Sequence, residues 1–184
     1  NLEEMRQMEE NRLEVAEAVI VPSLNEHIAT LDDLIRETKK KISQHIDDNP
    51  DLKRDSDLLK SIPGVGEMLS SSLLAFAGNL RRFTSSKALV AYAGLNPQRC
   101  ESGMFKGKSR LSKVGHGELR SALYMPAVVA GQYNVVVKDL IERLKLRGKT
   151  GKERVCAAMR KLLQLAYGVV KSGKTFNAEI PLAG

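Results

Sequence analysis

Apolar residues recur at steps of three and four along most of the chain, which is the spacing of one face of an α-helix. In the first third of the chain this spacing repeats as heptads, which predicts a coiled-coil-like arm that packs against a partner helix. The series runs through Met5, Met8, Arg12, Val15 and Val19, and then through Leu24, Ile28, Leu31, Ile35, Thr38, Ile42 and His45. Pro22 and Ser23 separate the two halves, so the pattern fits either a helical hairpin or one kinked helix.

The pattern alone does not identify the helix that covers this seam. The candidates are the preceding helix, a helix of a second copy of the chain, and a segment N-terminal to the chain. Arg12 interrupts the seam either as a device for partner specificity or, more commonly, as a surface arginine whose stem lies along apolar side chains.

Turn-forming residues from Asp47 to Asp51 mark the end of the arm. We therefore divide the chain into an arm, residues 1–52, and a C-terminal domain, residues 53–184. No convincing alternating strand pattern is present, so the predicted fold class is all-α. Further helices are expected after Leu69, from Ser85 or Ser86 to Gly94, over 118–133 with a bend near Pro126, over 135–146 and over 152–171.

Charge divides the chain in the same way. Residues 1–60 contain 9 Lys/Arg and 15 Asp/Glu, whereas residues 61–184 contain 20 Lys/Arg and 7 Asp/Glu. An acidic arm beside a basic domain is typical of a scaffold joined to a nucleic-acid-binding part. A helical domain that is merely basic is the alternative. No run of 18 apolar residues predicts a membrane span. The first residue is Asn1 and no leader follows it, so we expect a fragment of a longer protein.

Cysteine and histidine do not form a metal-binding pattern. Cys100 and Cys156 lie far apart, and the histidines at positions 27, 45 and 116 are scattered. We therefore expect no metal site in this chain, and the cysteine pattern fits a reducing cytoplasm.

A glycine-rich turn, Ile62-Pro63-Gly64-Val65-Gly66, separates two predicted helices. The amides of Gly64 and Gly66, together with the N-terminus of the next helix, are suited to contact a phosphate. This arrangement resembles the helix-hairpin-helix element of DNA-binding proteins. A tight turn that packs only against protein remains the alternative.

The segment 96–117 is predicted to be a long loop, and long loops in compact domains are more often functional than idle. It contains Ser102, whose hydroxyl could attack a phosphodiester if cations stabilise the transition state. Ser109 and Ser112 are rival candidates. The basic residues near it in sequence are Arg99, Lys106, Lys108, Arg110, Lys113 and Arg120.

An ordered set of motifs extends this interpretation. The segments in question are Ile62–Gly66, Phe83, Tyr92–Pro97, Ser102-Gly103, Leu111–Gly115 and Leu119–Leu123, preceded by Met8–Leu13. In this order they resemble the helical arm and C-terminal domain of DEDD-type insertion-sequence transposases. This is the insertion-sequence one-ten family, which also contains the Piv-like DNA invertases.

The resemblance implies a DNA transposase or site-specific recombinase in which Ser102 is the nucleophile. Lys113 and Arg120 match basic positions of the family and would contact phosphate, whereas His116 stands where asparagine is more usual and is expected to cap a helix or sit in a loop. The family's acidic domain, which binds divalent metal, is absent here. Expected partners are DNA, a structured guide RNA, and a second or further copy of the chain joined through the arm.

Two other functions remain open at this point. The chain could be a non-catalytic helix-hairpin-helix module that only holds nucleic acid, or an assembly domain whose arm drives dimerisation.

Overall fold

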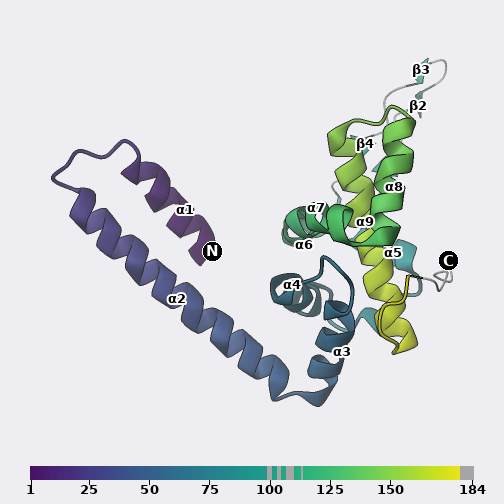
Figure 1. The fold of residues 1–184 in the computed structure, drawn as a ribbon, viewed down its shortest axis with the longest axis horizontal. Coiled ribbons are helices and arrows are strands. Elements are labelled where there is room, and N and C mark those ends of the chain that lie inside the picture. Colours follow the sequence, from purple (N-terminus) through teal and green to yellow (C-terminus); the bar gives the residue numbers. More distant parts are fainter. Residues whose placement is uncertain (99–100, 103–104, 107–109, 113, 179–184) are drawn as a thin grey trace. The chain divides into compact units, whose positions relative to one another are not determined.

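A computed structural model describes residues 1–178 except 99–100, 103–104, 107–109 and 113, with the backbone alone at 98, 101–102, 105–106 and 110 (Figure 1). The chain forms two compact units, Asn1–Pro50 and Asp51–Gly184, and the predicted boundary was at residue 52. Helices dominate, which confirms the all-α class. The elements are α1 (Leu2–Leu13), α2 (Val21–Asp47), α3 (Pro50–Lys60), α4 (Glu67–Ala77), η1 (Leu80–Arg82), α5 (Ser86–Tyr92), β1 (Pro97–Gln98), β2 (Glu101–Ser102), β3 (Phe105–Lys106), β4 (Arg110–Leu111), α6 (Gly117–Ala122), α7 (Tyr124–Tyr133), α8 (Val135–Leu146) and α9 (Gly151–Ser172).

The arm is a helical hairpin in which α1 packs along α2 (Figure 1). Polar contacts cross between the two helices, and their positions fall along α2 as they rise along α1, so the helices are antiparallel. Lys39 Nζ lies 2.9 Å from Glu3 Oε1, Arg6 Nε donates a hydrogen bond to Asp32 Oδ1, and His27 Nδ1 lies 3.5 Å from Glu9 Oε1. The kinked single helix is therefore excluded.

The seam predicted on α1 does not face α2. Met5 and Met8 are 41% and 53% exposed, and the face of α1 that is more buried carries Leu2, Arg6, Glu9 and Leu13 instead. The physical reason is that α1 has few apolar residues, so ion pairs with α2 decide which of its faces turns inward. The more apolar α2 keeps the predicted seam from Leu24 to Ile35, whereas Thr38, Ile42 and His45 near its C-terminal end are exposed.

The C-terminal end of α1 also differs from the predicted pattern. Val15 and Val19 were expected on a helix, but α1 ends at Leu13, and both valines lie in the connection at more than 80% exposure. Arg12 Nη1 contacts Glu9 Oε1 at 2.9 Å while its side chain stays 68% exposed, so Arg12 is a surface arginine.

Helix α9 is the centre of the second unit. It packs against α5, α7, α8 and η1 (Figure 1). One broad face of it is buried, as the apolar spacing predicted for 152–171. The buried residues of α9 are Ala158, Met159, Leu162, Leu163, Leu165, Ala166, Val169 and Val170.

Proline splits the helix that was predicted over 118–133. The chain forms α6 and α7 with a break at Leu123. Pro126 has no N–H to donate to the carbonyl of Ala122, and its ring would clash with that carbonyl in a continuous helix. The bend predicted near Pro126 is thus confirmed, displaced toward the N-terminus by about one turn.

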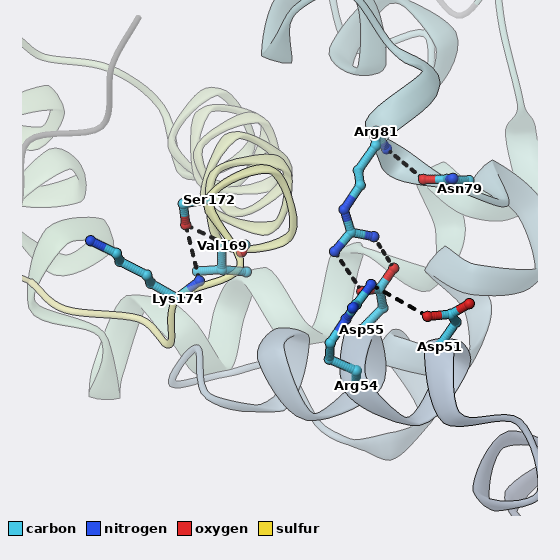
Figure 2. A network of polar contacts seen from close by, with 8 residues as sticks. All are labelled: Asp51, Arg54, Asp55, Asn79, Arg81, Val169, Ser172 and Lys174. Carbon is cyan, nitrogen blue, oxygen red and sulfur yellow. Dashed lines mark hydrogen bonds and ion pairs between the residues drawn. The ribbon is translucent and has the colours of Figure 1, made fainter.

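A buried ion pair joins α3 to η1 (Figure 2). Both oxygens of Asp55, which is 7% exposed, accept hydrogen bonds from the guanidinium of Arg81. Asn79 Oδ1 accepts from the Arg81 N–H at 2.9 Å and caps η1. The hydrogen bonds from Arg81 to Asp55 raise the pKa of the guanidinium. This pair therefore anchors the residues that precede the glycine-rich turn.

The N-terminus of α9 is closed by a capping box. Thr150 Oγ1 accepts from the Glu153 N–H at 3.4 Å, and Glu153 Oε2 accepts from the Thr150 N–H at 2.9 Å. The hydrogen bond from the Thr150 N–H, the contact of Lys149 Nζ at 3.0 Å from Glu153 Oε1 and the hydrogen bond from the Thr150 hydroxyl lower the pKa of the Glu153 carboxyl to about 2.

The lowered pKa of Glu153 predicts an acid-sensitive contribution to stability. Because the folded pKa lies below the ordinary value of 4.5, the contribution is present above pH 4.5 and declines as the pH falls toward 2. Urea unfolding at pH 7 and pH 3 should show that Glu153→Gln lowers stability at pH 7 and that the difference from wild type shrinks at pH 3. An equal difference at both pH values would contradict the capping account.

Candidate nucleic-acid interface

The glycine-rich turn joins α3 to α4 and is held to the core by its apolar residues. Ile62 and Val65 are buried, and the Val65 N–H donates to the Ile62 carbonyl at 2.9 Å. Ser61 Oγ donates to the Leu58 carbonyl and accepts from the Phe176 N–H. The backbone between these anchors has little freedom to move.

Gly64 fits because the turn lies directly against α7. Its φ of +98° is in the left-handed region, where a side chain is strained. A Cβ atom there would lie 2.6 Å from Ala130 Cβ and 2.8 Å from Ala130 Cα. Packing on protein alone therefore accounts for this glycine, as the tight-turn alternative expected. Phosphate binding by the Gly64 amide stays a prediction.

Asn134 ties the turn to the α7–α8 corner and was missed by the sequence analysis. Its side chain is fully buried, and its Nδ2 donates to the Pro63 carbonyl at 3.2 Å. Its Oδ1 caps α8 by accepting from the Val136 and Val137 N–H groups. An asparagine directly before an apolar helical run is a typical N-cap signal, but its second bond depends on the tertiary fold.

Gly66 is open, in contrast to Gly64. It precedes α4 with an extended backbone, no side chain caps the helix, and a Cβ atom would meet nothing within 4 Å. The helix N-terminus that follows offers N–H groups and a favourable dipole to an anion. Glu67 already places one negative charge in this first turn, so a phosphate must gain from backbone contact more than it loses by repulsion.

The long loop is closed at its base by backbone contacts. Strand β1 pairs with β4, and the Ser112 N–H donates to the Asn96 carbonyl at 2.9 Å. The His116 N–H donates to the Tyr92 carbonyl at 2.8 Å. Gly115, at φ +144°, packs so closely that a Cβ atom would lie 2.4 Å from the Tyr92 carbonyl oxygen. We call these contacts the loop neck.

His116 caps α6. Its Nδ1 accepts from the Leu119 N–H at 3.2 Å, and its ring centroid lies 4.7 Å from that of Phe76. The expectation that this histidine caps a helix is confirmed.

Arg120 also lies at the loop neck. Its Nη1 donates to the Ala93 carbonyl at 3.1 Å, which occupies one of its five N–H donors. Arg120 therefore helps to close α5 against α6, and the remaining donors are compatible with the predicted phosphate contact.

The backbone register places Ser102 in a second strand pair beyond the neck. Strand β2 pairs with β3, with Ser102 opposite Phe105 and Glu101 opposite Lys106. Such two-residue strands were not predicted. Arg110 lies in β4 opposite Gln98. The predicted contacts Arg99, Lys108 and Lys113, and the rival serine Ser109, lie outside the described residues.

The rival Ser112 has a structural bond. Its Oγ accepts from the Val114 N–H at 3.2 Å, within the loop neck. This hydrogen bond occupies one of the two lone pairs of the hydroxyl oxygen.

Other candidate chemistry is weak in the part of the chain that the structure describes. No group of three or more His, Cys, Asp or Glu side chains there could hold a metal ion. Burial raises the pKa of the Cys156 thiol, which makes it a poor nucleophile. No described helix is long and apolar enough to cross a membrane.

The chain is similar in sequence to known transposases and to a gene-inverting protein. Residues 56–142 match the profile of the Transposase IS116/IS110/IS902 family. The pilin gene-inverting protein of Moraxella bovis is 35% identical over 175 residues, which cover 94% of this chain and 54% of that protein. The transposase for insertion sequence element IS1328 of Yersinia enterocolitica is 27% identical over 86% of this chain and 47% of its own length. The chain thus spans about half the length of these relatives.

The two glycines of the turn should respond differently to substitution. Gly64→Ala should lower the free energy of unfolding by about 2 kcal/mol or more, because the methyl group meets the α7 backbone at a strained φ. Gly66→Ala, the matched control, should cost less than about 1 kcal/mol, because only the preference for glycine before a helix is lost. Equal costs in urea unfolding would contradict the packing of the turn on α7.

Proposed function

Because the chain belongs to the IS116/IS110/IS902 family of transposases, we propose that it is the nucleic-acid-binding and nucleophile-bearing part of a DNA transposase or recombinase. The observation that carries this proposal is the similarity over nearly the whole chain to a protein that inverts a gene. Gene inversion and transposition both require DNA strands to be cut and rejoined. The activity proposed here is therefore strand cleavage and rejoining.

In this proposal Ser102 Oγ attacks a phosphodiester phosphorus. The hydroxyl proton passes to a base, a phosphoserine ester forms, and the bond from phosphorus to the leaving oxygen of the strand breaks. Attack of a strand hydroxyl on this ester reverses the step and frees the serine. The ester conserves the phosphodiester bond, so rejoining needs no nucleotide cofactor.

The loop neck supports this role for Ser102. The neck contacts fix both ends of a loop that carries the serine together with Arg99, Lys106, Lys108 and Arg110. Cations near a developing phosphorane stabilise its charge. Lys113 and Arg120, at the neck, are proposed to contact phosphate.

The turn at Gly64 and Gly66 would hold the backbone of the nucleic acid without reading its sequence. The divalent metal that the family resemblance implies would be held by an acidic domain outside these residues, and the described part of the chain offers no ligand cluster for it. The chain would act with that domain on DNA in the bacterial cytoplasm, with a structured guide RNA as a further partner.

The arm is proposed to join copies of the chain. Its antiparallel hairpin leaves apolar side chains exposed on both helices, including Met8 at 53% and Ile42 at 44%. Burial of these side chains by a second arm would be favourable, because it removes apolar surface from water.

The nucleophile is tested with the metal-binding domain restored and a nicked suicide DNA substrate that prevents rejoining. Wild type should form a covalent protein–DNA adduct, and Ser102→Ala should abolish it while leaving DNA affinity within about threefold. Ser112→Ala is the matched control and should retain the adduct. An adduct that persists in Ser102→Ala would assign the chemistry to another residue.

Binding to the phosphate backbone should depend strongly on salt. About five phosphate contacts on duplex DNA predict that the logarithm of the association constant falls with the logarithm of salt concentration at a slope near −4.5. Fluorescence anisotropy between 50 and 200 mM salt measures this slope. A response that does not depend on salt would exclude backbone binding by this chain.

A further inference from the structure

A groove runs between α8 and α9, on elements that the proposed chemistry does not use. Its volume is about 360 Å³, within the range of sites that hold small ligands or a segment of a larger one. Figure 1 shows the two helices side by side along this contact. The groove is lined by Leu140, Arg143 and Leu144 of α8 and by Ala157, Arg160, Lys161 and Gln164 of α9.

The polar lining of this groove is cationic. Arg143, Arg160 and Lys161 converge on it, and the lining contains no carboxylate. Arg160 Nε is buried and donates to no acceptor among the described residues. A buried donor without an acceptor is costly, so the groove is incomplete as a purely structural feature.

Lys161 also shows that positive charge is in excess in this groove. Burial, together with the nearby charge of Arg143, lowers the pKa of its ammonium. Like charges gathered in a partly buried groove repel one another, and an anion placed between them would relieve that repulsion. The groove therefore favours a negatively charged occupant.

The surroundings of the groove distinguish an extended polyanion from a small free anion. Residues 143–161 carry eight Lys/Arg and one Asp/Glu. The basic residues continue past the groove along the end of α8 and the α8–α9 turn, where Arg147 and Lys152 are exposed. A free anion would need only the groove, whereas a phosphodiester backbone would also use this continuation. The apolar floor of Leu140, Leu144 and Ala157 suits the sugars between phosphates.

We propose that the α8–α9 groove is a second phosphate-binding site, which holds the phosphodiester backbone of a nucleic-acid strand apart from the Ser102 loop. Arg160 and Lys161 contact the phosphate and Arg143 closes the site from α8. The site rests on the proposed function only in that this function brings nucleic acid to the chain. DNA and guide RNA share the chemistry that the groove recognises.

The test compares two variants of the full chain with equal net charge. The groove variant carries Arg143→Gln, Arg160→Gln and Lys161→Gln, and the control carries Lys138→Gln, Lys171→Gln and Lys174→Gln at exposed positions outside the groove. Affinity for duplex DNA and for a folded RNA hairpin is measured by anisotropy across salt concentrations. The groove variant should bind at least one of them about tenfold more weakly than the control, with a salt slope smaller by about 2.

The two arms identify the strand that the groove holds. Loss confined to DNA assigns the groove to DNA, loss confined to RNA assigns it to RNA, and loss on both assigns it to the shared backbone. Equal binding by the groove variant and the control overturns the proposal. If wild type binds neither nucleic acid, the proposed function fails at its premise and the groove proposal falls with it, whereas a failure of the groove alone leaves wild-type binding intact.

A localised measurement on wild type removes the dependence on a folded variant. Amine acetylation followed by mass spectrometry should show that bound nucleic acid protects Lys161 at least threefold and leaves Lys171 unchanged. Equal modification of Lys161 with and without nucleic acid would also overturn the proposal.

Discussion

The close approach of the glycine-rich turn to α7 is the constraint on which the arrangement of the second unit depends. Gly64 lies where any Cβ atom would overlap Ala130, and Asn134 bonds the same turn while capping α8. α7 and α8 pack on the buried face of α9. The contact of the turn with α7 therefore fixes the start of α4 relative to the core. The open backbone at Gly66 is thus presented on a rigid support, which is what weak contacts to a phosphate require.

The loop neck shows the same kind of close backbone contact at the base of the loop that carries Ser102. Gly115 approaches the backbone of Tyr92 and Gly94 as closely as Gly64 approaches Ala130, again at a positive φ. Both segments are therefore anchored largely through backbone contacts with helices of the core. Because the loop-neck contacts hold the loop, the side chains between them need not contribute to folding. Ser102 and the cations of the loop are therefore available to contact a ligand.

Helical periodicity predicted the parts of the fold in which burial decides the structure. It located α8 and α9. Serine preference offered Ser85 or Ser86 as the cap of α5, and the structure shows that Ser85 accepts from the Ala88 N–H. Periodicity predicted that α1 is a helix but not which of its faces packs on α2, because ion pairs rather than apolar residues decide that face. It also missed the paired strands of the loop, since two residues are too few to show alternation.

The candidate site was predictable only in part. Glycine chemistry pointed to the turn, but only the fold revealed that Gly64 serves packing while Gly66 stays open. The groove joins residues of two helices and has no signature within either of them.

In the proposed mechanism, Ser102 forms the covalent bond to DNA. The most direct measurement is tandem mass spectrometry of the trapped protein–DNA adduct, after digestion with nuclease and protease, to find the residue that carries the nucleotide. We expect a nucleotide ester on Ser102. A nucleotide on any other residue, or the absence of an adduct from an assembly that cleaves DNA, would contradict it.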